Sequence, residues 1–471
     1  MMSRVVIVGG GIAALSTAFE LGRAGEIDVT VLERAARPGG NLRSERVDGY
    51  LCEWGPNGFL DNVPATPALV GELGIADRLL PADARAKRRF IYRNGRLHEL
   101  PGGPVGFALS GLLSIGGRVR VMAEPFAARR ADADETIHAF AARRVGIEAA
   151  DVLIDSMVSG IFAGNARELS LRACFPKMWE MEREHGSLVK AMLAKRREQR
   201  APSSDASMGA PRGHLTSFTG GIEDLVHALV RALGSRVKTG CVVRCVRPRT
   251  PGNPDGWVVD LEDGRSFDAD AVVLAGSASS SATLVEGFDR TLAGVLRQIP
   301  TAPLAVVCLG YETDRLDRPL GGFGFLVPRG EGIGILGALW DSSIYPGRAP
   351  EGRSLIRVMI GGAHDASAVM LDDETLIDRA RADLETTMRL TIEPVFTHVF
   401  RHPAGIPQYT VGHLSRVAAI DDGMRRHPGL FLAGNSYRGV SINACVADAA
   451  PVAAGVRAAA AAMGRRISAL Q

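Results

Sequence analysis

At the start of the chain, two continuous apolar runs flank a segment whose apolar residues recur at helical spacing. Arg4 to Val8 is an apolar run typical of a buried strand, and Asp28 to Leu32 is a second one that ends at Glu33. Between them, from about Ile12 to Ala24, apolar residues recur at helical spacing. This order predicts a strand, a helix and a second strand, the repeating unit of a parallel sheet.

The next part of the chain is predicted to be mainly helical. Residues 60 to 85 have a polar-faced helical pattern, and residues 105 to 198 mostly keep a helical period. Between these segments, Phe90 to Leu100 predicts a hairpin that turns at Asn94-Gly95. Ala201 to Gly213 is rich in Pro, Ser, Gly and Ala, which predicts a mobile loop.

Strand patterns return after residue 213. A helix is expected over about 373 to 390, and a long Ala-rich helix is expected to close the chain. The predicted strands are Val237 to Val246, Trp257 to Leu261, Ala271 to Ala275, Leu304 to Leu309, Leu355 to Ile360 and Leu430 to Gly434. The fold class is therefore mixed α/β, built on a Rossmann-like opening.

Length and composition narrow the class of protein. The 471 residues are too many for one hydrophobic core, so two or three domains are expected. The net charge of +3 and the short basic runs give no reason to expect a nucleic acid partner. The six cysteines form no C-x-x-C pair, which argues against a metal site and favours reduced thiols of a cytoplasmic protein. No signal peptide pattern is present.

The hydropathy pattern bears on contact with a membrane. No run reaches the ~18 to 20 apolar residues that a spanning helix needs. Pro101 to Gly117 carries no charge and is interrupted by Gly and Pro. From the residues alone, a buried loop and helix is the preferred interpretation, and a membrane surface or an apolar channel is the alternative.

The first glycines carry the clearest chemistry. Gly9-x-Gly11-x-x-Ala14 follows a strand and opens a helix, so the backbone can approach a pyrophosphate at the helix N-terminus. Glu33 lies 22 residues beyond Gly11, at the end of the second strand, where a carboxylate accepts hydrogen bonds from a ribose hydroxyl. Together these features predict a dinucleotide site.

Three further glycine-rich segments suggest a cofactor spread over a whole domain. Gly39-Gly40, within Arg37 to Arg43, allows a second close backbone approach. Gly55 to Phe59 can pass close to a flat ring, and Gly439 to Ser441 opens the terminal helix. Taken alone, the Arg37 to Arg43 segment would be interpreted as an ordinary glycine-rich turn.

The chain resembles the flavin amine-oxidase superfamily. The motif that carries this resemblance is Glu33-x-x-x-Arg37-x-Gly39-Gly40, which follows the glycine loop. Longer stretches resemble its oxygen-dependent protoporphyrinogen oxidase branch, nearly end to end. These stretches are Glu53 to Phe59, Gly160 to Asn165, Leu169-Ser170 with Phe175-Pro176, Gly322 to Pro328, Ile406 to Tyr409 with Gly412-His413, and Gly434 to Val440. Two positions depart from the family pattern: Ala14 replaces the third glycine, and Ala444 replaces an Asp near the C-terminus.

The resemblance implies a non-covalent FAD. By motif matching, the cofactor-binding residues are Gly9, Gly10, Gly11, Ile12, Ala13, Ala14, Glu33, Arg34, Gly40, Asn41, Gly55, Pro56, Asn57, Gly58, Val243, Gly439, Val440 and Ser441. Val243 is matched to the adenine and Gly439 to Ser441 to the isoalloxazine. Without the resemblance, Val243 would be a plain core residue of a strand.

The resemblance also implies a porphyrinogen substrate, which needs apolar walls and one or two cationic anchors. Arg89 matches the arginine that binds a propionate, and Arg88 is the alternative. Without the resemblance, Arg89 would be interpreted as a surface arginine in a basic run. Leu326, Leu339 and Met359 match wall positions, although pattern alone places them in a core. Gly160 matches a backbone carbonyl that faces the ring nitrogens.

No catalytic side chain is expected, because flavin N5 accepts the hydride and the protein orients the substrate. The resemblance implies that O2 then reoxidises the flavin. Oxidation of coproporphyrinogen III is an alternative to oxidation of protoporphyrinogen IX. An amine oxidase, a desaturase or a non-catalytic flavin-binding protein are the further alternatives.

The resemblance implies three parts of the chain. We expect an FAD-binding domain from residues 1–60, 214–285 and 400–471, a substrate-binding domain from 61–100 and 286–399, and a helical, membrane-docking subdomain from 101–213. It further implies a cytoplasmic protein with peripheral contact to the cytoplasmic face of a membrane and handover of its product to a chelatase. The oligomeric state is left open.

Overall fold

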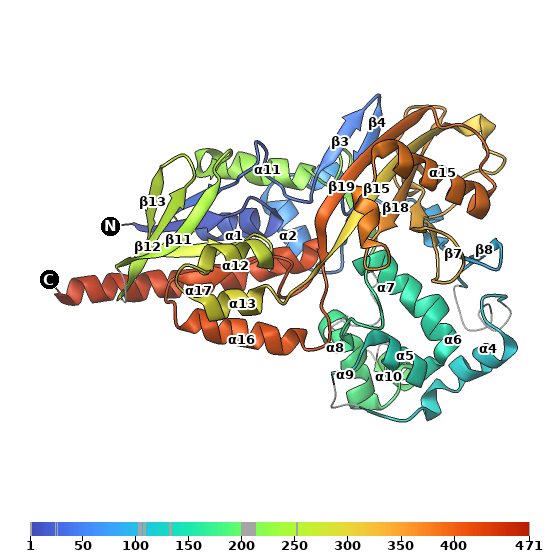
Figure 1. The fold of residues 1–471 in the computed structure, drawn as a ribbon, viewed down its shortest axis with the longest axis horizontal. Coiled ribbons are helices and arrows are strands. Elements are labelled where there is room, and N and C mark those ends of the chain that lie inside the picture. Colours follow the sequence, from blue (N-terminus) through green and yellow to red (C-terminus); the bar gives the residue numbers. More distant parts are fainter. Residues whose placement is uncertain are drawn as a thin grey trace.

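A computed structural model gives the fold of the protein (Figure 1). It describes residues 2–23, 25, 27–101, 106, 110–130, 134–198, 213–250 and 253–470. Residues 201–212 of the predicted mobile loop lie outside these ranges, as do residues 102–105 and 107–109 of the uncharged 101–117 segment.

A five-stranded parallel sheet forms the first layer, with strand order β10-β2-β1-β14-β20. Its strands come from widely separated parts of the sequence: β1 (Ser3–Val8), β2 (Ile27–Leu32), β10 (Val237–Lys238), β14 (Ala271–Leu274) and β20 (Leu430–Leu432). They are short and apolar because both faces of the sheet are covered. The sheet therefore forms only when both ends of the chain are present.

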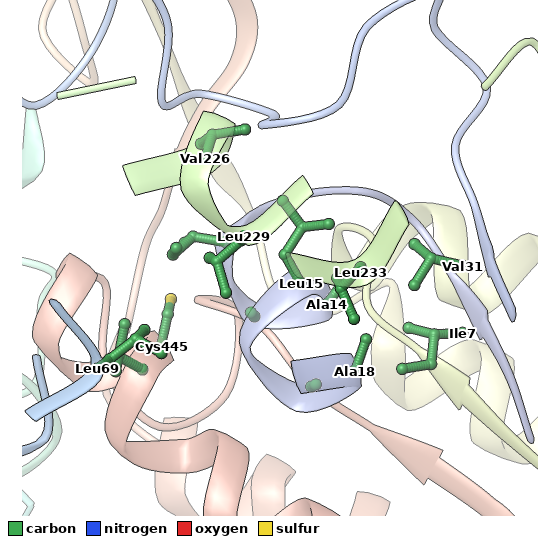
Figure 2. Packing of buried hydrophobic residues seen from close by; sticks show 14 of the residues in the cluster. Ile7, Ala14, Leu15, Ala18, Val31, Leu69, Val226, Leu229, Leu233 and Cys445 are labelled. Atoms are coloured by element: carbon green, nitrogen blue, oxygen red, sulfur yellow. The ribbon is translucent and has the colours of Figure 1, made fainter. Parts of the chain in front are cut away.

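Helix α1 (Ile12–Gly22) is the centre of the core on one face of this sheet. It packs against α2 (Ala65–Glu72), α11 (Asp224–Leu233) and α17 (Ile442–Leu470) through one continuous apolar cluster. Figure 2 shows Ala14, Leu15 and Ala18 of α1 between the sheet and the Val226, Leu229 and Leu233 side chains of α11. The small residues of α1 allow this close packing on several sides.

A second cluster covers the opposite face of the parallel sheet. It includes a three-stranded antiparallel sheet and three helices. These are β11 (Val243–Thr250), β12 (Asn253–Leu261), β13 (Ser266–Ala269), α12 (Ala278–Val285), α13 (Arg290–Leu296) and α16 (His413–Arg425).

A seven-stranded mixed sheet forms the second large layer, in the order β19-β15-β18-β17-β16-β7-β8. Its strands are β7 (Phe90–Arg93), β8 (Arg96–Glu99), β15 (Thr301–Glu312), β16 (Gly324–Leu326), β17 (Ile335–Leu339), β18 (Arg353–Gly361) and β19 (Phe396–Pro407). Helix α15 (Asp373–Met388) covers one face. The short helix α14 (Asp341–Ile344) follows β17.

Two small sheets are also present. One pairs β3 (Ser44–Val47) with β4 (Tyr50–Glu53), and the other places β9 (Leu215–Phe218) between β5 (Phe59–Leu60) and β6 (Leu79–Pro81). Short 3-10 turns lie at Ala76–Arg78, Ala84–Lys87, Glu124–Phe126, Gly234–Arg236, Thr313–Arg315 and Ala366–Met370.

A helical lobe lies beside the seven-stranded sheet (Figure 1). It contains α4 (Ile115–Met122), α5 (Ile137–Val145), α6 (Ile147–Ala149), a π-helical turn at Ala150–Ile154, α7 (Asp155–Phe162), α8 (Leu171–Cys174), α9 (Pro176–His185) and α10 (Leu188–Glu198). The guanidinium of Arg144 is fully buried at its centre and pairs with Glu124 and Glu182. Helix α7 contacts β16 and β17, so it joins the lobe to the sheet.

Several sequence expectations differ from the structure. Residues 60–85 contain only one α-helix and include β5 and β6, because their pairing partner β9 lies far along the chain. The strand expected over Val237 to Val246 is interrupted at Gly240, whose φ of +66° breaks it into β10 and β11. The hairpin at Asn94-Gly95 is confirmed, and both turn residues have positive φ.

The expectation of no segment apolar enough to span a membrane also needs correction. Helix α17 is long and apolar enough over Ile442–Ala461, with a mean hydropathy of 1.3, by length and composition. One face of it packs against α1 in the core of the first layer. Its apolar composition therefore has a packing explanation within the fold.

Candidate functional site

The N-terminus of α1 is uncovered. Gly11 is its N-cap residue, and no side chain in the described ranges caps the first turn. A Cβ built on Gly11 would meet no atom of these residues within 4 Å, so open space lies in front of the helix. The unsatisfied N–H groups and the helix dipole make this space suitable for an anion.

Glu33 holds the same loop from the end of β2. One oxygen of its carboxylate accepts a hydrogen bond from the N–H of Gly10 at 2.6 Å, and the other accepts one from Ala35 at 2.8 Å. A carboxylate has about four acceptor positions, so about two remain for hydroxyl donors. The carboxylate thus shapes the glycine loop in addition to the ribose contact expected from the sequence.

The second glycine pair lies directly against the first. The N–H of Gly39 donates to the carbonyl of Gly10 at 2.7 Å, and a Cβ on Gly40 would lie 3.3 Å from the Cα of Gly11. Gly39 and Gly40 have φ of +118° and +59°, which an L side chain rarely adopts. Asn41 and Gly40 are exposed beside the open space.

The stretch Gly55–Gly58 lies next to Asn41. A Cβ on Gly55 would lie 2.7 Å from the carbonyl oxygen of Asn41, and one on Gly58 would lie 2.6 Å from that of Thr216. Both positions therefore require glycine. The Nδ2 atom of Asn57 is buried and has no hydrogen-bond partner among the described residues, while Pro56 is exposed.

The start of α17 supplies the last of these segments. The N–H of Gly439 donates to the hydroxyl of Tyr409 at 2.7 Å, and that hydroxyl donates to the carbonyl of Asn435 at 2.6 Å. Ser441 caps the helix by accepting from the N–H of Ala444 at 3.1 Å. Val440 packs against the core of the helical lobe.

The remaining cofactor candidates have simpler surroundings. Ile12, Ala13 and Ala14 are buried within α1, and Arg34 is exposed. Val243 lies in β11 opposite Leu261 and is half-buried. These surroundings are compatible with the roles expected from the sequence.

These residues fit a flavin dinucleotide. Open space precedes α1, glycines occur where any Cβ would collide, and the amide of Asn57 is a buried donor without a partner. No group of three or more potential metal ligands occurs within the described residues.

The candidate substrate wall lies on one face of the seven-stranded sheet. Met359 pairs with Gly337, which also pairs with Leu326, and Leu339 lies two residues further along β17. All three apolar side chains are half-buried, whereas their strand neighbours are buried in the opposite face. Gly160 of α7 is exposed, and a Cβ there would lie 2.7 Å from the side chain of Leu326.

The structure distinguishes the two adjacent arginines. Arg88 forms an ion pair with Glu99 at 2.8 Å. Arg89 has no carboxylate partner within the described residues, and its guanidinium lies 4.7 Å from the centre of the Phe323 ring. Desolvation by surrounding protein atoms lowers the pKa of Arg89, although the residue keeps solvent contact. Arg89 is therefore the guanidinium that remains available to an external anion.

Sequence reasoning missed a cluster of four buried charges between the glycine segments and the wall. Glu53 pairs with Arg348 at 3.2 Å, and Asp341 pairs with Arg357 at 3.0 Å. Their side chains are at most 3% exposed. Desolvation raises the pKa of Glu53 to about 7, against the opposing effect of Arg348, and it also raises the pKa of Asp341. No sequence pattern links positions so far apart.

Comparison with known proteins gives the family of the chain. The family model for flavin containing amine oxidoreductases matches residues 12–462. A human protoporphyrinogen oxidase is 36% identical over 476 residues, covering 94% of this chain and 96% of the relative. A coproporphyrinogen III oxidase of Bacillus subtilis is 29% identical over 459 residues, covering 94% and 95%.

Solved structures agree on the fold. A protein from Exiguobacterium, provisionally named a protoporphyrinogen oxidase, superimposes with a TM-score of 0.84 at 26% identity, covering 97% of this chain and 99% of that one. A reduced UDP-galactopyranose mutase superimposes with a TM-score of 0.75 at 15% identity, covering 98% of each chain, which shows a shared fold alone.

We expect Gly11→Asp to abolish flavin binding. The new carboxylate does not clash with the described residues, because none of their atoms lies within 4 Å of that Cβ position. It would, however, occupy the space for the pyrophosphate and repel its negative charge. The measurement is the flavin-to-protein absorbance ratio after purification. Gly287→Asp, at another glycine with open space, is the control and should keep its flavin. A full complement of flavin in Gly11→Asp would show that the pyrophosphate lies elsewhere.

A second prediction concerns pH. The folded-state pKa of Glu53, about 7, is above its ordinary value of 4.5, so the stability it contributes is complete below about pH 4.5 and is lost as pH rises through about 7. Glu53→Gln cannot titrate. In urea unfolding from about pH 5 to about pH 8, the stability difference between wild type and variant should therefore shrink as pH rises. A difference that is constant with pH would contradict this, and exposed Glu72→Gln is the control.

Proposed function

The chain belongs to the family of flavin-containing amine oxidoreductases, in the branch of the porphyrinogen oxidases. From this membership we propose that it oxidises protoporphyrinogen IX to protoporphyrin IX with O2 as the electron acceptor. It is an FAD-dependent oxidoreductase, and the bound FAD supplies the hydride-accepting centre. Haem or porphyrin biosynthesis is the pathway implied by the names of its relatives.

The observation that carries the substrate proposal is the setting of Arg89. Its guanidinium has no carboxylate partner among the described residues, and it lies just before β7 in the sheet that bears Leu326, Leu339 and Met359. A porphyrinogen combines a large apolar ring system with propionate carboxylates, so it needs an apolar wall with a cation at its edge. A guanidinium binds a carboxylate through two parallel hydrogen bonds.

The charges of nearby arginines support protoporphyrinogen over coproporphyrinogen III. Arg88, Arg329 and Arg357 are each already paired with a carboxylate of the protein. Coproporphyrinogen III carries two more carboxylates, which would need further cations. Oxidation of coproporphyrinogen III remains the second candidate, because a relative bears that name.

The chain's own residues orient the substrate and exclude water. The wall holds the ring system, Arg89 holds a propionate, and the carbonyl of Gly160 is a candidate acceptor for a pyrrole N–H. None of these groups needs to take part in bond breaking. The cofactor roles given above to the glycine segments, Glu33 and Val243 are likewise proposals.

The helical lobe is also proposed to contact an anionic membrane surface from the cytoplasmic side. Ile115, Val119, Met122 and Phe126 follow each other at helical spacing along α4 and the turn after it, and are between 60% and 89% exposed. Exposed Arg129 and Arg130 follow this stripe, which adds positive charge beside the apolar side chains. This is the pattern of an interfacial helix. Handover of the product to a chelatase stays a prediction.

We expect Arg89→Ala to weaken substrate binding by ~2 to 5 kcal/mol, seen mainly as a higher KM, because the propionate is remote from the reacting carbon. The measurement is the gain of porphyrin fluorescence at varied substrate concentration. Arg89→Lys should restore only part of the loss.

Arg88→Ala is the matched control, since Arg88 is already paired with Glu99. Flavin content should not change in any of these variants. An unchanged KM of Arg89→Ala for both protoporphyrinogen IX and coproporphyrinogen III would show that the anchor lies elsewhere. A larger defect with one of them identifies the substrate that this site prefers.

A further prediction tests the membrane surface. Val119→Asp with Met122→Asp places two carboxylates on the exposed apolar stripe without disturbing the core, because neither side chain is buried. Sedimentation with vesicles containing anionic lipid should fall strongly, while flavin content and activity on soluble substrate should be retained. Met370→Asp, at an 82% exposed residue outside the lobe, is the control. Equal sedimentation of all three proteins would refute the contact.

A further inference from the structure

Arg357 lies where the candidate wall meets the candidate cofactor site. It projects from the same face of β18 as Met359, two residues away, because side chains alternate along a strand. It also pairs directly with Leu339 of β17. Arg357 therefore lies in the same layer as the wall residues.

The guanidinium of Arg357 reaches the backbone of the Glu53–Gly58 stretch. Its Nη1 donates to the carbonyl of Glu53 at 3.0 Å and to that of Gly55 at 2.8 Å. Its Nε lies 3.0 Å from the carboxylate of Asp341. One side chain thus connects the wall strand β18, the start of α14 and the glycine stretch.

A second arginine supports the same stretch through its side chain. Arg348 pairs with the carboxylate of Glu53, donates to the hydroxyl of Ser217 at 2.8 Å, and lies over the ring of Tyr345. The carboxylate of Glu53 also accepts from the N–H of Ile222 at 3.0 Å and from the hydroxyl of Ser44 at 2.5 Å. Both the backbone and the side chain of Glu53 are therefore fixed from buried positions.

Stability alone does not account for this arrangement. Buried ion pairs lose so much hydration that well-packed apolar residues in their place are often equally stable or more so. What a buried guanidinium provides, and an apolar side chain cannot, is a set of directed hydrogen bonds to carbonyl groups of another segment.

We propose that Arg357, oriented by Asp341, is a positioning residue that fixes the Gly55–Gly58 stretch, and so the flavin ring, relative to the porphyrinogen wall. The inference rests on the proposed function. Hydride transfer depends steeply on the separation and alignment of donor and acceptor, so a small displacement of one segment against the other is costly. Arg357 and Asp341 contact neither reacting atom in this scheme and act through the backbone that they hold.

The test removes both charges together. The double variant Arg357→Met with Asp341→Leu leaves no unpaired buried charge, so it should fold and retain FAD. Under anaerobic conditions, the rate at which protoporphyrinogen IX reduces the bound flavin should fall about 10- to 100-fold, with KM nearly unchanged. The visible circular dichroism of the oxidised flavin should also change, and this signal needs no substrate.

The matched control lies on the same strand. Arg353 of β18 pairs with Glu312 of β15 at 2.8 Å, and both side chains are about one-third exposed. Arg353→Met with Glu312→Leu removes a more exposed arginine–carboxylate pair of the same strand, away from the glycine stretch. It should leave the reduction rate and the visible circular dichroism of the flavin as in wild type.

Arg357→Lys is the second variant, and it carries the test if the double variant does not fold. Lysine keeps the charge beside Asp341 but cannot bridge that carboxylate and both carbonyls, so its reduction rate should lie between those of wild type and the double variant. Wild-type reduction rate and circular dichroism in a folded double variant, or in Arg357→Lys, would overturn the proposal. If wild-type protein itself is not reduced by the porphyrinogen, the proposed function fails, while the circular dichroism still decides whether Arg357 positions the flavin.

Discussion

The open space before α1 is the constraint on which the rest of the structure depends. It exists because Gly39 donates to the carbonyl of Gly10 and because Gly11 and Gly40 approach without side chains. Glu33 then fixes the loop from the end of β2. The helix behind the loop cannot shift to close this space, since it is enclosed by the parallel sheet, α11 and α17 (Figure 2). The site for an anion is therefore held open by the core of the fold.

The sequence predicted features that depend on neighbouring residues. The first strand, helix and second strand are confirmed because a 3.6-residue period, a glycine turn and two apolar runs are local signals. The hairpin at Asn94-Gly95 is confirmed for the same reason. The error over residues 60–85 arose because β6 exists only through pairing with β9, more than 130 residues later, and no local pattern records that pairing.

The candidate site shows the same division. Glycine positions could be identified in the sequence because a missing side chain has a direct steric meaning. The choice between Arg88 and Arg89 could not be made there, since it depends on Glu99 occupying one of them. The buried charges at positions 53, 341, 348 and 357 were invisible for the same reason, because each is costly alone and acceptable only beside a partner brought close by folding.

The strand order of the parallel sheet has a consequence for biosynthesis. Strand β1 is made long before β20 and α17, which complete the sheet and cover α1. A growing chain therefore exposes an incomplete sheet edge and the apolar side of α1 until these later segments have been made. The cofactor cannot be enclosed by its full set of contacts before then, so loading with FAD follows the synthesis of β20 and α17. A nascent chain that lacks these segments also depends on protection from aggregation.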